Sequence, residues 1–397
     1  MKIGIVTYVK CDNYGAELQA YAMQYLFRKL GYDAEVLNLE KREKDLTSSV
    51  SAIFPAIINR FKVFGCKAPM KIIKLIIDVV ERKKASRSYV EEEKDKHKLF
   101  TDFFEENIVH SEKYYTLESV YVDNMPYDVF VAGSDQIWNY MHTDNLDVYF
   151  LMFANRFKAK KISYAASISI HDIPHRLLAD YKKYFENLDY IAVRELRGKE
   201  LVEKYSNKKA EVVLDPTLVV TKDEWKQNIA NEIRKDEKYV LIYTLSGSFY
   251  IKELAKSIAL RIGKDCKVIN IKSNFRNENS NDGIEYLYNV GPKEWVGLIL
   301  HAAYVVTDSF HGTVFSINFN VPFTTLVNPA SNMNSRVMSI LTIMQLQDRI
   351  IYDDDSNLRP KSLVVDYQKV NDVVRIWRAK SVDYITKALS LGNENSY

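Results

Sequence analysis

The sequence is poor in the residues that mark disulfide-rich, fibrous and low-complexity proteins. Its three cysteines, Cys11, Cys66 and Cys266, are odd in number, far apart and without a CxxC pair. This pattern argues against a disulfide framework and against a cysteine-rich zinc site. Only 13 glycines and 9 prolines occur among the 397 residues, which excludes a collagen-like or low-complexity chain.

Long apolar runs and a large excess of one charge are also absent. No run reaches the roughly 18 apolar residues needed to cross a bilayer. The opening MKIGIVTYV lacks the features of a signal peptide, so we expect a strand there and a cytoplasmic protein. The net charge is +3, from 55 basic and 52 acidic residues, which argues against a nucleic-acid partner. His, Asp and Glu show no metal-ligand spacing, so we expect no required metal.

What is present is a soluble composition with a βα rhythm, 47% hydrophobic and 27% charged. Residues 3–9, 16–30 and 34–39 read as strand, helix and strand, which favours a parallel sheet. Residues 41 to about 120 break this rhythm, and we expect a helical insertion there. Runs typical of strands then recur at 128–132, 161–166, 190–193, 211–214, 239–245, 267–271, 304–307 and 323–327.

We therefore predict an α/β protein with two Rossmann-like domains and parallel sheets. The first domain spans 1–220, contains the helical insertion and is completed by a C-terminal helix, 371–397. The second spans 236–370, after a charged boundary. Because ligands bind beyond the carboxyl ends of parallel strands, polar residues that follow a strand are the candidates for a site.

The clearest candidate is VVTDSFHGTVF at 305–315, an apolar strand that runs into a polar turn and an apolar helix. The helix N-terminus, with Ser309 and Gly312, offers free N–H groups to an anion. His311 is a candidate proton donor or phosphate contact. The alternative is that the polar residues cap the helix and His311 is a satisfied core residue.

Two further turns follow predicted strands. FVAGSDQIWN at 130–139 presents Asp135, Gln136 and Trp138, a mixture that suits sugar binding, or else a turn in which Asp135 caps and Trp138 packs. The turn with Asn13 and Tyr14 is neither a GxGxxG nor a P-loop, so it predicts no dinucleotide or ATP site. Helix capping explains that turn better than a ligand contact does.

Two arginines also lie close after predicted strands. Arg194 follows 190–193 and can fork onto a carboxylate or phosphate, or else pair with Glu195. Arg336 lies in a polar loop that leads into a helix. Like Arg194, it could bind an anion or be an ordinary surface arginine.

Together these segments resemble the polysaccharide pyruvyl transferase family. The resemblance rests on NYGAELQAYA, VFVAGSDQIWN, ISYAASI, IAVREL, VVLDPTL and VVTDSFHGTVFSI, in this order over most of the chain. It implies a GT-B-like arrangement of the two domains. It also implies transfer of pyruvate from phosphoenolpyruvate onto two hydroxyls of a sugar, giving a cyclic ketal and phosphate. The acceptor would belong to a bacterial surface polysaccharide or its lipid-linked precursor, and phosphoenolpyruvate would be a co-substrate with no cofactor needed.

The resemblance also suggests roles for single residues. His311 matches the family's histidine before glycine, as acid or phosphate contact, and Arg194 matches an arginine suited to the phosphoenolpyruvate anion. Many members carry an arginine where this chain has Ser309, and we hypothesise that Arg336 replaces it. Asp135 would contact or deprotonate the acceptor hydroxyl. The other expected acceptor contacts are Asn13, Tyr14, Gln136 and Trp138.

Two alternatives remain open at this stage. A GT-B glycosyltransferase using a nucleotide sugar would share the architecture, since a fold does not fix a function. A catalytically inactive sugar-binding relative would fit the departure at Ser309.

The stretch 54–87 is basic and amphipathic. Its cations are Arg60, Lys62, Lys67, Lys71, Lys74, Arg82, Lys83, Lys84 and Arg87, opposed only by Asp78 and Glu81. Such a segment suits an anionic membrane surface, which would place the enzyme peripherally on the cytoplasmic face of the inner membrane. The alternative is a helical pair that packs on the first domain.

Overall fold

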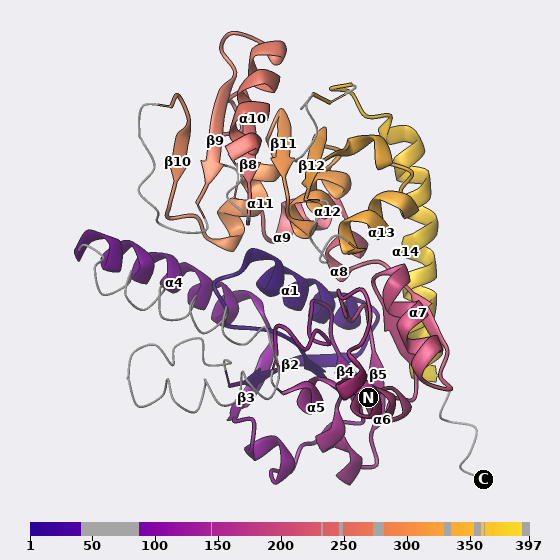
Figure 1. Ribbon diagram of the computed structural model, residues 1–397. Helices are drawn as coiled ribbons and strands as arrows, with labels where there is room; N and C mark the ends of the chain where they lie inside the picture. Colours follow the sequence, from indigo (N-terminus) through magenta and orange to yellow (C-terminus); the bar gives the residue numbers. More distant parts are fainter. Residues whose placement is uncertain are drawn as a thin grey trace.

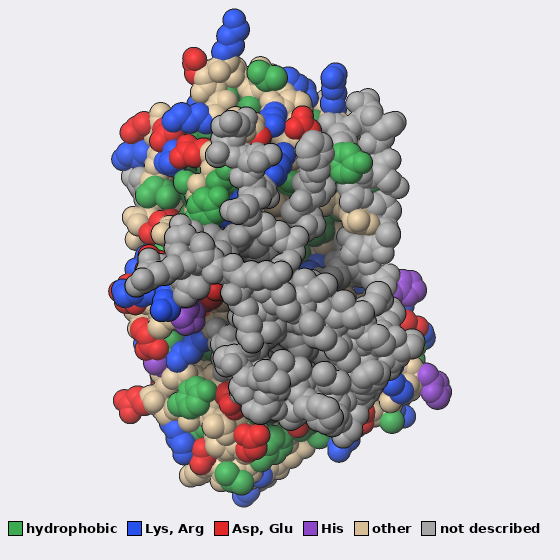
Figure 2. All heavy atoms as spheres, turned by 60° about the vertical axis from the view of Figure 1, so that its left-hand side comes forward, with side chains coloured by type: hydrophobic (Ala, Val, Ile, Leu, Met, Phe, Trp, Pro, Cys, Tyr) green, Lys and Arg blue, Asp and Glu red, His purple; other side chains and the backbone are tan. Residues whose placement is uncertain are grey.

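The computed structural model describes residues 1–40, 87–143, 145–231, 233–245, 249–272, 282–328, 335–352, 359–360 and 362–390. The basic stretch lies outside these residues up to residue 86, so its membrane role stays a prediction. Among the described helices, none is both long enough and apolar enough to cross a membrane. On the face in Figure 2, the acidic and basic side chains of the described residues are interspersed.

The first half of the chain forms a parallel sheet with the order β3-β2-β1-β4-β5. Its strands are β1 (Lys2–Val6), β2 (Asp33–Leu39), β3 (His110–Tyr115), β4 (Val129–Ala132) and β5 (Lys160–Ser163). A parallel pair, β6 (Ile191–Val193) and β7 (Ala210–Val212), continues this sheet beyond β5 through the bridge between Ala166 and Val193. The loops after β4, β6 and β7 therefore reach the same edge.

The second half forms another parallel sheet, with the order β10-β9-β8-β11-β12-β13. Its strands are β8 (Tyr239–Tyr243), β9 (Lys267–Ile271), β10 (Glu285–Leu287), β11 (Tyr304–Thr307), β12 (Phe323–Val327) and β13 (Ile350–Tyr352). Figure 1 shows the two sheets in separate halves of the molecule, with α1 between them. The fold prediction of two parallel α/β domains is confirmed.

Helices cover both sheets. Those of the first half are α1 (Tyr14–Lys29), α4 (Arg87–Asn107), α5 (Leu146–Tyr149), α6 (Leu178–Glu186), α7 (Leu196–Tyr205), α8 (Pro216–Val219) and α9 (Lys222–Asn228). Those of the second half are α10 (Phe249–Ile262), α11 (Pro292–Leu300), α12 (Phe310–Phe319), α13 (Ser335–Ile343) and α14 (Tyr367–Ser390). The short 3₁₀ turns are η2 (Ser119–Tyr121), η3 (Met152–Arg156), η4 (His175–Leu177) and η5 (Gln347–Arg349).

One part of the sequence prediction is wrong. We expected a helical insertion at 41 to about 120, and α4 lies in it, but its last part forms β3, a strand on the edge of the first sheet. It pairs with β2 in parallel, and three successive side chains from Glu112 to Tyr114 are exposed. An edge strand with polar side chains carries no apolar run, so periodicity could not reveal it.

The two halves are in direct contact. The Tyr14 ring stacks on Trp295 of α11 at a centroid distance of 5.4 Å, and its hydroxyl donates to the carbonyl of Val290 at 2.8 Å. A single hydrophobic core contains buried residues of both halves, from Leu18 of α1 to Phe315 of α12. This contact fixes the carboxyl edges of the two sheets relative to each other.

The helix α14 returns from the second half to the first, along one side of the molecule in Figure 1. The Tyr384 hydroxyl donates to the carbonyl of Ser163 at 2.8 Å, and Ser381 Oγ accepts from the Leu214 N–H at 2.9 Å. Arg378 bonds both halves, to the carbonyl of Leu218 and to Asn318 Oδ1, each at 2.8 Å. The last described helix thus packs on the first sheet.

Candidate active site

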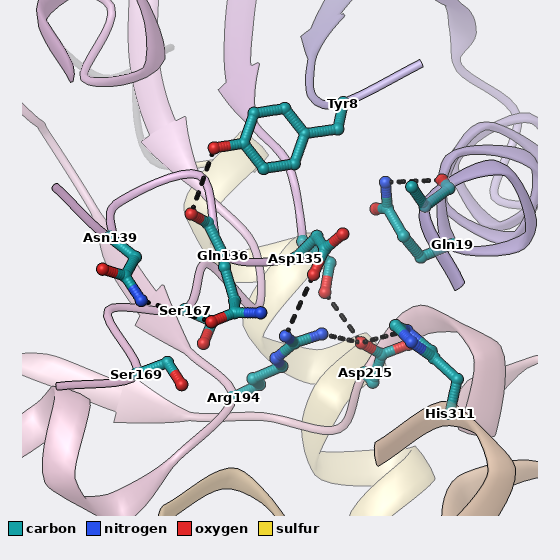
Figure 3. A network of polar contacts seen from close by, with 12 residues as sticks. Tyr8, Gln19, Asp135, Gln136, Asn139, Ser167, Ser169, Arg194, Asp215 and His311 are labelled. Atoms are coloured by element: carbon teal, nitrogen blue, oxygen red, sulfur yellow. Dashed lines mark hydrogen bonds and ion pairs between the residues drawn. The ribbon is translucent and has the colours of Figure 1, made fainter. Parts of the chain in front are cut away.

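Charged side chains from both halves meet between the two sheets. Asp135 follows β4, Arg194 follows β6 and Asp215 follows β7, while His311 comes from the first turn of α12 in the second half. Figure 3 shows the three side chains of the first half converging on one point, with His311 facing them across the domain boundary. The carboxyl edges of the two sheets therefore build one site together.

Arg194 is bound by carboxylates on two sides. Its side chain is fully buried, with Nη1 2.9 Å from Asp215 Oδ2 and Nη2 3.2 Å from Asp135 Oδ1. Its guanidinium carbon also lies 4.4 Å from the ring centroid of Phe310. Each terminal nitrogen donates to one carboxylate, whereas Nε has no hydrogen-bond partner among the described residues.

Asp215 lies at the centre of this network. Its Oδ2 accepts from Arg194 and from Ser134 Oγ at 2.8 Å, and its Oδ1 accepts from the N–H and hydroxyl of Thr217. Burial alone would raise the pKa of Asp215, but His311, Arg194 and Thr217 outweigh burial and hold it far below its ordinary value. The sequence analysis did not name this residue as a site candidate, although it lies in the VVLDPTL segment. Its signal was a carboxylate directly after a buried strand and before a proline.

Asp135 is the second carboxylate of the site. Burial would raise its pKa, but Arg194, with smaller contributions from His311 and Arg336, lowers it below the ordinary value. Its φ of 73° lies in the left-handed region, which a non-glycine residue adopts at an energetic cost. The carbonyl of Asp135 accepts from the Ser167 N–H at 2.9 Å, which holds this conformation. The carboxylate is therefore ionised and fixed in place.

His311 faces the carboxylates from the second half. Ser309 caps α12 by accepting from the Gly312 N–H at 3.4 Å, which places His311 in the first helical turn. The imidazole Nε2 lies 3.8 Å from Asp215 Oδ2 and is buried without a hydrogen-bond partner. The positive end of the α12 dipole and the imidazole thus point into the same space.

Arg336, at the start of α13, brings a second guanidinium. Its charge centre is 5.8 Å from the Phe310 ring, and its Nε is buried without a hydrogen-bond partner. The Gln136 amide fits its neighbours only with its oxygen toward Arg336, where it accepts from Nη1 at 3.2 Å and Nη2 at 3.3 Å. Burial and the charge of Arg194 lower the pKa of Arg336 to about 10. No carboxylate of the described residues is within ion-pair distance of it.

A second residue that sequence reasoning did not place in the site, Glu195, orders the loop after β5. Its Oε1 accepts from Ser167 Oγ at 3.1 Å and from the N–H groups of Ile168 and Ser169 at 2.8 and 3.0 Å. Its Oε2 is buried, 3.9 Å from Arg194 Nε, and has no hydrogen-bond donor. Ser169 has a φ of 49°, so this loop too is held in a costly conformation.

Unpartnered polar atoms gather at this site. They are Gln19 Oε1, Arg194 Nε, Glu195 Oε2, His311 Nε2 and Arg336 Nε, all buried and without a hydrogen bond to any of the described residues. Buried polar groups are normally paired, because each unpaired one costs about 1–3 kcal/mol. Such a concentration in one place is the mark of a site built for a polar ligand.

Three of the expected acceptor contacts have their polar atoms or rings engaged elsewhere in the protein. Trp138 is fully buried, stacks on Phe150 at 4.4 Å, and donates its indole N–H to the carbonyl of Tyr149. Tyr14 is used in the contact between the two halves. Asn13 caps α1 by accepting from the Ala16 N–H at 3.2 Å. The geometry gives these three packing and capping roles and leaves Asp135 and Gln136 facing the site.

Metal-ligating side chains are not clustered here. Within the part of the chain that the structure describes, no three His, Cys, Asp or Glu side chains are placed to hold one metal ion. The network is built from two guanidiniums, three carboxylates and an imidazole, a set suited to anion binding and proton transfer.

A family model described as polysaccharide pyruvyl transferase matches residues 13–329. The chain belongs to the polysaccharide pyruvyl transferase family, which makes it an enzyme that moves a pyruvyl group in polysaccharide biosynthesis. No protein of curated function matches the chain.

Solved structures show the architecture. UDP-GlcNAc 2-epimerase from Methanocaldococcus jannaschii is 14% identical, with a TM-score of 0.52 over 99% of this chain and 100% of that one. The enzyme of the same name from Neisseria meningitidis is 9% identical (TM-score 0.48; 98% and 99% covered), and the Escherichia coli heptosyltransferase WaaC is 14% identical (TM-score 0.40; 96% and 100% covered). The first of these likenesses shows the GT-B fold, and at this identity it shows nothing about the reaction.

Proposed function

We propose that this enzyme transfers pyruvate from phosphoenolpyruvate onto two hydroxyls of one sugar, forming a cyclic ketal. The enol carbon C3 gains a proton and becomes a methyl group. C2 forms two C–O bonds to the sugar and loses its bond to phosphate. Of the two hydroxyl protons, one replaces the proton given to C3 and the other leaves on inorganic phosphate. The acceptor would be part of a bacterial surface polysaccharide or its lipid-linked precursor.

Arg336 carries this proposal. A guanidinium that is half-buried, with its Nε fully buried and no carboxylate partner among the described residues, is costly, and it becomes favourable when an anionic ligand completes it. The carboxylates of the site are already committed, Asp135 and Asp215 to Arg194, and Glu195 to the loop after β5. The carboxylate or phosphate of phosphoenolpyruvate would supply the missing partner.

The same argument accounts for Ser309. Its hydroxyl caps α12, and it is too short to reach an anion as an arginine would. Arg336 enters the site from the next helix, past the same Phe310 ring that Arg194 contacts. We infer that the cation that many family members carry at this helix start comes from Arg336 in this chain.

Proton transfer falls to His311 and Asp135. The His311 imidazole, with Nε2 3.8 Å from Asp215 Oδ2, is the group of the site suited to give a proton to C3. Because the pKa of Asp135 is held low, its carboxylate is a weak base but a good hydrogen-bond acceptor. Asp135 would therefore orient and polarise the attacking hydroxyl, while the α12 dipole and Arg336 stabilise charge on the leaving phosphate.

Thermal unfolding with phosphoenolpyruvate, compared with nucleotide diphosphates and nucleotide sugars, tests the proposal. A ligand that binds only the folded chain raises its apparent stability. We expect a shift with phosphoenolpyruvate that is lost in Arg336→Ala. A shift with nucleotides alone would replace the proposal with a glycosyltransferase. Sugar binding without phosphate release in any acceptor assay would indicate an inactive relative.

A further inference from the structure

Gln19, on α1, has no role in the proposed reaction. Its side chain is fully buried, and its Oε1 has no hydrogen-bond partner in the part of the chain that the structure describes. Its Nε2, in contrast, donates twice, to Thr7 Oγ1 and to the carbonyl of Ala16, both at 2.9 Å. The amide nitrogen is thus fully hydrogen-bonded, whereas the amide oxygen has no donor.

These contacts fix which way the amide faces. The Ala16 carbonyl can only accept, and the Thr7 hydroxyl already gives its proton to the carbonyl of Ser134 at 3.0 Å. A flipped amide would turn its oxygen against two acceptors. Oε1 is therefore an obligatory acceptor that needs a donor from a ligand.

The position of Gln19 links it to both halves of the site. The Thr7 hydroxyl accepts from the Gln19 amide and donates to the carbonyl of Ser134, so it connects the amide to the turn after β4. The Thr7 side chain also packs closely on this turn, because a Cβ on Gly133 would lie 2.8 Å from Thr7 Cβ. Gly15, one turn earlier on the same face of α1, touches His311. Figure 3 shows the Gln19 side chain extending from α1 toward Asp135, on the side of the network where His311 lies.

Because Gln19 Oε1 can only accept a hydrogen bond, phosphoenolpyruvate cannot be its partner. The oxygens of ionised phosphoenolpyruvate are acceptors and cannot satisfy Oε1, whereas a sugar hydroxyl can. We propose that Gln19 binds one hydroxyl of the acceptor diol and Asp135 the other. This inference rests on the proposed function and adds the subsite that selects a molecule with two neighbouring free hydroxyls.

The two acceptors differ, and so the hydroxyls attack in order. The Asp135 carboxylate polarises its hydroxyl, which adds to C2 first, and the proton released from this hydroxyl replaces the one that His311 gave to C3. An amide oxygen takes up no proton, so the hydroxyl on Gln19 keeps its proton until phosphate departs. That hydroxyl then closes the ring, and its proton ends on the phosphate.

A crystal structure of the wild-type enzyme with phosphoenolpyruvate, grown in molar glycerol, tests the inference. Glycerol is the probe because it is a small molecule that carries both a 1,2- and a 1,3-diol. We expect one glycerol hydroxyl within about 2.8 Å of Gln19 Oε1 and another at Asp135. Phosphoenolpyruvate against Oε1, or only a water there, would overturn the inference.

Variants separate this subsite from the donor site. Gln19→Met should lose the bound glycerol, because methionine offers the glycerol hydroxyl no amide oxygen. Its phosphoenolpyruvate affinity should stay within about twofold of the wild type in calorimetric titration, because Gln19 does not contact phosphoenolpyruvate. Gln24→Met, at another buried glutamine of α1, should keep both ligands. A tenfold loss of phosphoenolpyruvate affinity in Gln19→Met would refute the assignment. Glycerol at Gln19 in an enzyme that fails to bind phosphoenolpyruvate would support the hydroxyl subsite and refute the proposed donor.

Discussion

The imidazole of His311 packs against the backbone of Gly15. A Cβ at position 15 would be 1.9 Å from His311 Nδ1 and 2.4 Å from Cε1, far inside van der Waals contact. Gly15 belongs to α1 of the first half and His311 to α12 of the second. The absence of a side chain at one residue thus makes room for the proposed acid of the reaction.

Replacing Gly15 by alanine should abolish turnover. The added methyl group must displace His311 or push the two halves apart, and overpacking of this kind costs about 1–3 kcal/mol. We expect phosphate release from phosphoenolpyruvate to fall at least a hundredfold in steady-state assays, with a folded protein by circular dichroism. Gly263→Ala is the matched control, since a Cβ there meets only Lys238 Nζ at 3.9 Å. Normal turnover in Gly15→Ala would show that His311 has no part in the chemistry.

The two arginines should respond in opposite ways to replacement by methionine. Arg194→Met leaves Asp135 and Asp215 buried without their cation, which should cost about 3–5 kcal/mol in urea unfolding. Arg336→Met removes a cation that has no carboxylate partner, so the unliganded protein should lose less than about 1 kcal/mol or gain stability. Phosphoenolpyruvate affinity of Arg336→Met should fall more than tenfold. Equal destabilisation by both variants would contradict this account of Arg336.

Acid should destabilise the protein through Asp135 and Asp215. Both have folded pKa values below the ordinary value, so their contribution is complete above about pH 5, where both states are ionised. Below about pH 4 the unfolded chain takes up protons first, and the free energy of unfolding falls. Asp215→Asn should be less stable at pH 7 and show a shallower decline from pH 5 to 3. The exposed Asp372→Asn, which loses only a surface pair with Arg375, should follow the wild type. An unchanged slope in Asp215→Asn would rule out this linkage.

Trp138→Phe distinguishes packing from acceptor binding. The indole is fully buried and its N–H is bonded to a carbonyl, so the change should cost about 2 kcal/mol in urea unfolding. Phosphoenolpyruvate affinity should stay within twofold. The partly exposed Trp377→Phe provides a comparison on α14, with a smaller expected loss. Unchanged stability in Trp138→Phe would return this residue to the list of acceptor contacts.

The central strands could be read from the sequence and the edge strands could not. The apolar runs 267–271, 304–307 and 323–327 coincide with β9, β11 and β12, because buried parallel strands are apolar on both faces. β3 lies at a sheet edge with exposed polar side chains, and the edge strands β10 and β13 are only three residues long, too short to show a period. Periodicity contains no signal for such strands.

The site was predictable in outline for a similar reason. Polar residues directly after strands must lie at one edge of a parallel sheet, so Asp135 and Arg194 could be expected near one another, whereas His311 follows a strand of the other sheet and meets them only through the GT-B-like arrangement that the resemblance implied. The direction of each side chain could not, and Trp138 turns into the core while Gln136, two residues earlier, faces Arg336. The central place of Asp215 depends on β7 lying beside β6, a pairing that no local pattern encodes.

The return of α14 to the first sheet affects how the protein is made. Tyr384 bonds Ser163 across 221 residues of sequence, and Ser381 bonds Leu214 across 167. On the ribosome, the sheet that emerges first waits for a helix that is translated after the whole second sheet. The first domain therefore stays without its last helix until the second sheet has been synthesised.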